Sequence, residues 1–173
     1  KDWLLLTDEV QTGVGRTGKL FAFQQYDLLP DVCSFAKGIA GGMPMSGIMA
    51  NEKCRNVLTP GTHATTFGGN PVCAAAGLVV QDVLSDEFLA EVTAKGEYLR
   101  QQIEALDLPC FGKTRGMGLM IGIEVKDGYN KSEIAMRVTV LLYCVSYTVI
   151  PIPSFTFYLL YCTAFPSPCQ YSS

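Results

Sequence analysis

The chain has 173 residues, of which 49% are hydrophobic, and its formal net charge is −3. That length allows one domain with a sizeable core. The acidic balance argues against nucleic-acid binding, because phosphates require a basic surface. Seven cysteines without a CxxC pair, and a single histidine, argue against a zinc site and fit buried thiols in a reducing, cytoplasmic compartment. The chain starts at Lys1-Asp2 without a methionine or a targeting segment, so we expect its natural N-terminus to lie upstream.

Short apolar runs and glycine-rich loops alternate in the first part of the chain. Residues 3–7 are an apolar run, which predicts a buried parallel strand that ends at Asp8. A glycine-rich loop follows at residues 11–19. Further strands are predicted at residues 31–35 and 46–50.

Helical patterns occupy the middle of the chain. Asn70 followed by Pro71 predicts a helix start, with Asn as the N-cap and Pro at the first helical position, and the helix should end near Leu84. Apolar residues at helical spacing predict a longer helix at residues 86–106, and a strand is predicted at residues 119–125. This alternation predicts an α/β protein with a mixed, mostly parallel sheet flanked by helices.

The loop Gly13–Lys19 matches two phosphate-binding patterns, G-x-G-x-x-G and the start of a P-loop. A P-loop requires Ser or Thr at the next position to bind Mg²⁺, and this chain has Leu20 there. A dinucleotide fingerprint would open directly into a helix, and residues 20–23 contain no clear cap. The preferred interpretation is a loop of tight turns beside a buried site. A nucleotide-binding module that uses Gly13–Lys19 remains the alternative of a different class.

Lys37 follows the apolar pair Phe35-Ala36 and precedes Gly38 at a predicted strand end. An apolar setting favours the neutral amine, which attacks an aldehyde carbon. Alone, such a lysine is more often a surface turn residue. However, Asp8 at another strand end could keep a pyridine nitrogen protonated, and Thr65 and Thr66 offer hydroxyl and backbone donors suited to a phosphate. Pyridoxal phosphate requires these partners, and the carboxyl ends of neighbouring strands bring such residues together.

Five motifs occur in order between residues 2 and 126: Asp8-Glu-Val-Gln-Thr-Gly13, Gly15-Arg-Thr-Gly-Lys19, Ala36-Lys-Gly38, Thr66-Phe-Gly-Gly-Asn-Pro71 and Arg115-Gly-Met-Gly-Leu-Met-Ile-Gly122. Together they resemble the signature of the class III aminotransferases, in particular the ornithine and acetylornithine group. Several separated motifs in this order are far more specific than a lone glycine pattern. The resemblance implies part of the large domain of a fold-type I pyridoxal-phosphate-dependent transferase.

The resemblance also implies a role for each matching residue. Lys37 would form the Schiff base with pyridoxal 5′-phosphate and transfer the proton during catalysis. Asp8 would bind the pyridinium nitrogen, Val10 would pack on the ring face, and Gln11 would lie near the ring hydroxyl. Thr66 would bind the cofactor phosphate, in this family usually that of the neighbouring subunit, which implies a homodimer.

The implied reaction is ping-pong transamination of an ω-amino donor, such as N-acetylornithine or ornithine, with 2-oxoglutarate as the 2-oxo acid acceptor. The alternatives are 4-aminobutyrate or another ω-amine as the donor, or an inactive fragment. By the family pattern, residues before Asp2 would include the glycine-rich phosphate cradle, the aromatic residue stacked on the ring and an arginine for a substrate carboxylate.

The resemblance divides the chain into three parts. Residues 1–106 match the C-terminal part of the cofactor-binding large domain, and residues 107–130 match the start of the small C-terminal domain. Residues 131–173 are a charge-poor tail, without any Asp, Glu, Lys or Arg from position 138 onward. A membrane anchor would explain the apolar runs at 138–150 and 155–165, but both are shorter than the roughly 20 residues that span a bilayer. A wrong reading frame after about residue 130 explains the composition better.

Overall fold

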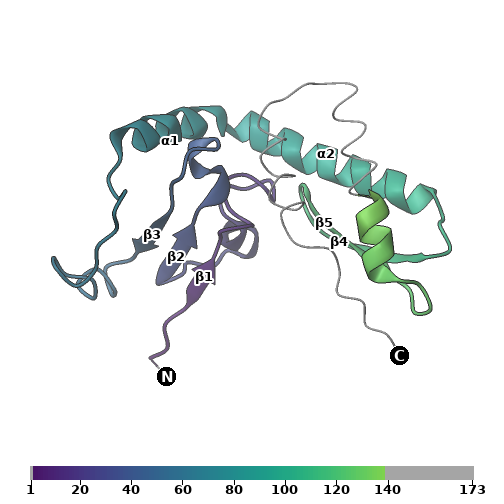
Figure 1. Cartoon of the computed structure of the whole chain (residues 1–173), viewed down its shortest axis with the longest axis horizontal. Helices are drawn as coiled ribbons and strands as arrows, with labels where there is room; N and C mark the ends of the chain where they lie inside the picture. Colours follow the sequence, from purple (N-terminus) through teal and green to yellow (C-terminus); the bar gives the residue numbers. More distant parts are fainter. Residues whose placement is uncertain (1, 139–173) are drawn as a thin grey trace, which may run out of the picture. The chain divides into compact units, whose positions relative to one another are not determined.

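The computed structural model describes residues 2–138, which fall into two units that divide after Lys126. The first unit contains the helices and strands labelled in Figure 1. Its strands are β1 (Leu6–Asp8), β2 (Val32–Phe35), β3 (Gly47–Ala50), β4 (Phe111–Met117) and β5 (Met120–Val125). Its 3₁₀ helices are η1 (Ala22–Tyr26) and η2 (Lys37–Ala40), and its α-helices are α1 (Pro71–Val83) and α2 (Asp86–Ala105).

Strands β1, β2 and β3 form one sheet in that order. β1 pairs with β2 in parallel, with Asp8 opposite Ser34, whereas β2 and β3 are antiparallel, with Phe35 opposite Gly47. The predicted mixed sheet is therefore confirmed, and its parallel ladder within the described residues joins β1 to β2. Because these two strands are parallel, the segments that follow them leave the sheet at the same edge.

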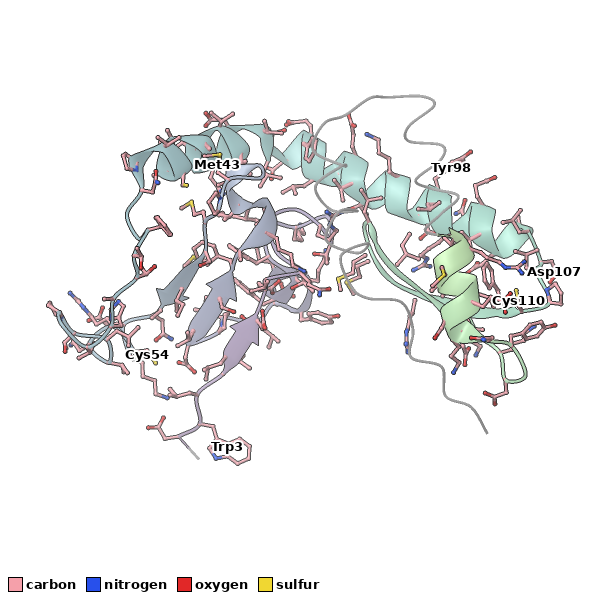
Figure 2. All side chains as sticks on the ribbon, in the orientation of Figure 1. Trp3, Met43, Cys54, Tyr98, Asp107 and Cys110 are labelled. Carbon is pink, nitrogen blue, oxygen red and sulfur yellow. The ribbon has the colours of Figure 1, made fainter. Side chains whose placement is uncertain are left out.

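The apolar run at residues 3–7 forms a strand only in part, because β1 begins at Leu6. The prediction that this run is buried is wrong for the described residues, since Trp3 is 76% exposed and Leu6 is 64% exposed. Figure 2 shows the Trp3 ring projecting away from the ribbon. Within the described residues β1 is an outer strand of its sheet, and an apolar run is buried only where another layer covers it.

Helix α1 begins where the sequence predicts it. The Asn70 side chain accepts hydrogen bonds from the backbone N–H groups of Val72, at 2.9 Å, and Cys73, at 3.3 Å, and Pro71 occupies the first turn. These contacts satisfy two of the donors that a helix N-terminus leaves unpaired. The helix packs against η2, where Gly77 lies close to the carbonyl of Ile39. Its buried residues are Cys73 and Gly77.

Helix α2 packs against the antiparallel hairpin of β4 and β5. β5 confirms the predicted strand at 119–125, whereas β4 was not predicted, because its sequence has no alternation of apolar and polar residues. The buried positions of α2 are Leu89, Val92 and Gly96. The buried apolar residues of this unit are Phe21, Cys33, Ile39, Ala40, Cys54, Cys73, Leu89 and Val92.

The second unit is described only up to residue 138. Residues 131–138 are helical, and the Asn130 side chain caps this helix by accepting from the N–H groups of Ser132, at 3.1 Å, and Glu133, at 3.2 Å. The apolar runs predicted at 138–150 and 155–165 lie outside the described residues, except for Val138. Among the helices in the described part, none has the length and apolar character needed to cross a membrane.

Candidate cofactor site

The Asp8 carboxylate lies at the carboxyl end of β1, opposite Ser34 of β2. Its Oδ1 accepts a hydrogen bond from the N–H of Val10, at 3.0 Å, and one from the hydroxyl of Ser34, at 3.3 Å. Within residues 2–138, no hydrogen bond to Oδ2 is found. The carboxylate is exposed, so it combines a fixed orientation with one oxygen that is open to an external donor.

Lys37 begins η2, three residues after Ser34 on the strand that neighbours Asp8. Its φ of 51° lies in the left-handed region, which costs a non-glycine residue about 1–2 kcal/mol. Such strain persists where the surrounding structure enforces it, often at functional positions. The expectation of an apolar setting is wrong for the described residues, because the Lys37 side chain is exposed. The side chains that η2 buries are Ile39 and Ala40.

The segment between Asp8 and the glycine-rich loop is held by Glu9, which the sequence did not single out. Glu9 is only 3% exposed. Its carboxylate accepts hydrogen bonds from the N–H groups of Ala22, at 3.0 Å, and Phe23, at 2.9 Å, and from the Thr12 hydroxyl. Next to it, Val10 is half-buried and Gln11 is exposed. The only sequence signal for this role was a carboxylate in the middle of the motif, and its two backbone partners in η1 lie 13 and 14 residues away.

Thr66 is exposed and lies in the turn that leads to Asn70 and helix α1. Among the described residues, no hydrogen bond or ion pair joins Thr66 to Asp8 or Lys37. The parallel ladder thus brings together the ends of β1 and β2, with Asp8, Val10, Gln11 and Lys37, whereas Thr66 belongs to a separate segment.

The glycines of the loop at residues 11–19 lie close to side chains of other parts of the chain. A Cβ at Gly18 would lie 2.1 Å from Oγ1 of Thr93 in α2, and a Cβ at Gly15 would lie 2.7 Å from Cδ2 of Leu84. The helix that follows is η1, a 3₁₀ helix of five residues. A phosphate-binding fingerprint relies instead on the open N-terminus of an α-helix, so this geometry disfavours the nucleotide-binding alternative.

A cavity of about 410 Å³ lies beside the same loop, lined in part by Thr12, Thr17, Arg115 and Met120. Neither Asp8 nor Lys37 lines it. The cavity is therefore separate from the strand ends that carry the candidate cofactor residues.

Residues 1–153 match the family model described as Aminotransferase class-III. The chain belongs to the class-III aminotransferases. The family prediction made from the five motifs is confirmed, and so is the partial α/β fold. The match also extends beyond residue 126, where the resemblance read from the motifs had ended.

Class-III relatives with curated names cover most of this chain. It is similar to the acetylornithine aminotransferase of Bifidobacterium longum, with 54% identity over 129 residues, which are 71% of this chain and 30% of that protein. The acetylornithine aminotransferase of Caldanaerobacter subterraneus is 47% identical over 139 residues, which are 79% of this chain and 35% of that protein. The chain therefore spans about a third of the length of these relatives.

Solved structures of aminotransferases have the same fold. The acetylornithine aminotransferase of Elizabethkingia anophelis has a TM-score of 0.66 and 41% identity, and the match covers 75% of this chain and 33% of that one. The ornithine aminotransferase of Toxoplasma gondii, whose structure has partial occupancy of pyridoxal phosphate at the active site, has a TM-score of 0.69 and 34% identity, covering 79% and 33%.

The groups at the β1–β2 edge fit the cofactor that class-III aminotransferases use. A carboxylate with one open oxygen suits a protonated ring nitrogen, and an exposed primary amine suits an aldehyde. The two groups come from neighbouring strand ends of a parallel pair. Both kinds of partner are therefore present on the same edge of the sheet.

Proposed function

We propose that Asp8 and Lys37 form the ring-nitrogen and lysine parts of a pyridoxal 5′-phosphate site in a transaminating enzyme. The observation that carries this proposal is the register of β1 and β2, in which Asp8 lies opposite Ser34 and Lys37 begins the turn after β2. The positive φ of Lys37 supports it, because strained backbone conformations cluster at functional positions.

When bound, pyridoxal phosphate supplies an aldehyde that bonds to an amine and a ring that takes up a carbanion's electron pair. The Nζ of Lys37 would hold the cofactor and, once released from it, would move a proton to and from the substrate carbon. The open Oδ2 of Asp8 would accept a hydrogen bond from the protonated ring nitrogen and so keep that nitrogen charged. Its other oxygen is held by Val10 and Ser34, which fixes the direction of the carboxylate.

The remaining roles follow from position. Val10, which follows Asp8 closely, would pack against the ring face, and the exposed Gln11 would reach the ring hydroxyl. Thr66, which is exposed in the turn before α1, would bind the phosphate of a second copy in a cytoplasmic homodimer. The domain boundaries at 106 and 130 remain predictions.

N-acetylornithine is the proposed amino donor and 2-oxoglutarate the proposed acceptor. Two relatives with 54% and 47% identity are named acetylornithine aminotransferases, which supports this donor over ornithine, 4-aminobutyrate or another ω-amine. Activity is proposed for the whole protein, because the chain spans about a third of the length of these relatives.

The test uses the purified chain mixed with pyridoxal phosphate. We expect a visible absorbance band, and after borohydride reduction we expect the cofactor to be found on the Lys37 peptide by mass spectrometry. Lys37→Ala should abolish both signals. Lys95→Ala is the matched control, since Lys95 is an exposed lysine on α2 that pairs with Glu91 at 2.8 Å. Absorbance and labelling that persist in Lys37→Ala would refute the assignment.

The nucleotide-binding alternative gives the opposite pattern. It predicts that ATP raises the melting temperature and that Lys19→Ala abolishes this effect. A chain that binds neither cofactor nor nucleotide would be an inactive segment of a class-III aminotransferase.

A further inference from the structure

We propose that Glu9 is a positioning residue of the cofactor site, a role that rests on the proposed function of Asp8 and Lys37. Glu9 stands between Asp8, assigned to the ring nitrogen, and Val10, assigned to the ring face. Because its side chain is buried and bonded within the protein, it would touch neither the cofactor nor the substrate. Instead, its buried side chain fastens the segment that carries both residues to the start of η1.

Three donors converge on the Glu9 carboxylate. Oε1 accepts from the N–H of Phe23 at 2.9 Å, and Oε2 accepts from the N–H of Ala22 at 3.0 Å and from the Thr12 hydroxyl. The two N–H groups belong to the first turn of η1, where a helix leaves its donors unpaired. One side chain therefore accepts hydrogen bonds both from the start of η1 and from the turn after Val10.

The backbone of Glu9 is fixed as well. Its N–H donates to the carbonyl of Ser34 at 2.9 Å, and its carbonyl accepts from the N–H of Gly13 at 2.9 Å. Ser34 is also the residue whose hydroxyl binds Asp8. Glu9 is thus held by β2, by η1 and by the following turn, so the direction of the Asp8 carboxylate depends on this residue.

A carboxylate is required because every described partner of the side chain is a donor. The isosteric Glu9→Gln replaces one oxygen with an NH₂ group, which meets an N–H or O–H donor and leaves it without an acceptor. The side chain keeps its size, so the change removes hydrogen bonds without opening a cavity. We expect the segment from Asp8 to Gly13 to open more often.

The first measurement is amide hydrogen exchange in the 173-residue chain, which requires no bound cofactor. Glu9→Gln should speed exchange about tenfold in peptides that cover residues 8–13 and 22–26, since losing one buried hydrogen bond changes an opening equilibrium by about that factor. Glu91→Gln is the matched control, because it is the same substitution at an exposed carboxylate on α2, outside the site. It should leave exchange in these peptides unchanged.

The second measurement separates positioning from a general loss of structure. It follows the visible absorbance of bound pyridoxal phosphate against pH. A displaced Asp8 would keep the ring nitrogen protonated less well, so the ring would carry less positive charge. The Nζ of Lys37, when it is bonded to the cofactor, would then be more basic. The midpoint of the absorbance change should therefore move to higher pH in Glu9→Gln. A purely structural role would lower the fraction of chain with bound cofactor and leave this midpoint in place.

A milder pair of variants covers the case in which Glu9→Gln does not fold. Thr12→Val removes one of the three donors with little change of shape, whereas Thr12→Ser keeps the hydroxyl. Thr12→Val should speed exchange in residues 8–13 by a smaller factor, and Thr12→Ser should match the wild type. Equal exchange in Thr12→Val and Thr12→Ser would overturn the proposal, as would wild-type exchange and an unshifted midpoint in Glu9→Gln. If the wild-type chain binds no cofactor, the proposed function fails, and the exchange data still decide the anchoring by Glu9.

Discussion

Gly96 of α2 faces Gly118 in the turn between β4 and β5, so closely that a Cβ at position 96 would lie 2.0 Å from the Gly118 carbonyl oxygen. A side chain cannot occupy that space, because the nearest atoms belong to the backbone of Gly118 and cannot rotate away as a side chain could. Gly96→Ala should therefore push α2 away from the hairpin and lower the free energy of unfolding by about 2 kcal/mol or more. Chemical denaturation would measure the loss.

Gly77→Ala in α1 is the comparison for this prediction. A Cβ there would lie 3.3 Å from the Ile39 carbonyl oxygen, a contact that a small shift relieves. Replacing glycine within a helix also gains about 1 kcal/mol in helix propensity. Gly77→Ala should thus change the free energy of unfolding much less than Gly96→Ala. Wild-type stability of Gly96→Ala would contradict the close approach of α2 to the hairpin.

The Asn70 cap gives a second prediction. Its side chain accepts hydrogen bonds from two backbone N–H groups of α1, so Asn70→Ala should lower the free energy of unfolding by about 1 kcal/mol. Asn70→Asp keeps the acceptor and adds a negative charge that a helix N-terminus favours. It should equal or exceed the wild type in thermal denaturation. Equal stability of all three proteins would contradict the capping role.

The lowered pKa of Asp31 should make the free energy of unfolding depend on pH. The N–H of Leu5, at 2.7 Å, and the amide of Asn51, at 2.9 Å, lower the pKa of Asp31 below its usual 3.8, and Lys53 adds to the effect. A carboxyl group with a lowered pKa stabilises the fold above its unfolded pKa and loses this contribution as the pH falls through the folded one. The wild type should therefore exceed Asp31→Asn in stability at neutral pH, and this advantage should shrink below about pH 4. Urea denaturation across this range would show it, and a constant difference would argue against the prediction.

The Cys33 thiol should react more slowly than the Cys110 thiol. Cys33 is 3% exposed, and burial, together with the charges of Glu9 and Asp8, raises the pKa of its thiol above the usual 9.0. The thiolate is the reactive form. Iodoacetamide should therefore label Cys110, which is partly exposed, before Cys33 in the native chain. Urea should remove the difference, whereas equal native rates would show that β2 does not protect Cys33.

The parts of the fold that were predictable have local causes. Asn70 and Pro71 determine the start of α1 within a few residues, and the apolar spacing of α2 lies within its own sequence. Asp8 and Lys37 were placed at strand ends because the runs before them are short and apolar.

The parts that were missed depend on distant contacts. β4 has no alternating pattern, and only its pairing with β5 makes it a strand. The role of Glu9 depends on where η1 begins, 13 residues further along the chain. The exposure of Trp3 and Leu6 was missed for the same reason, since burial depends on which layers cover a strand and not on the strand itself.

The exposed edge of β1 affects the solubility of the chain. Leu6 of β1 and Trp3 before it are exposed, and within the described residues β1 has an edge without a neighbouring strand. Such edges recruit strands from other molecules. The purified chain should lose solubility as its concentration rises. The same edge would pair with other copies of the chain until another polypeptide segment shields it. The solubility of the purified chain will therefore depend on what covers β1.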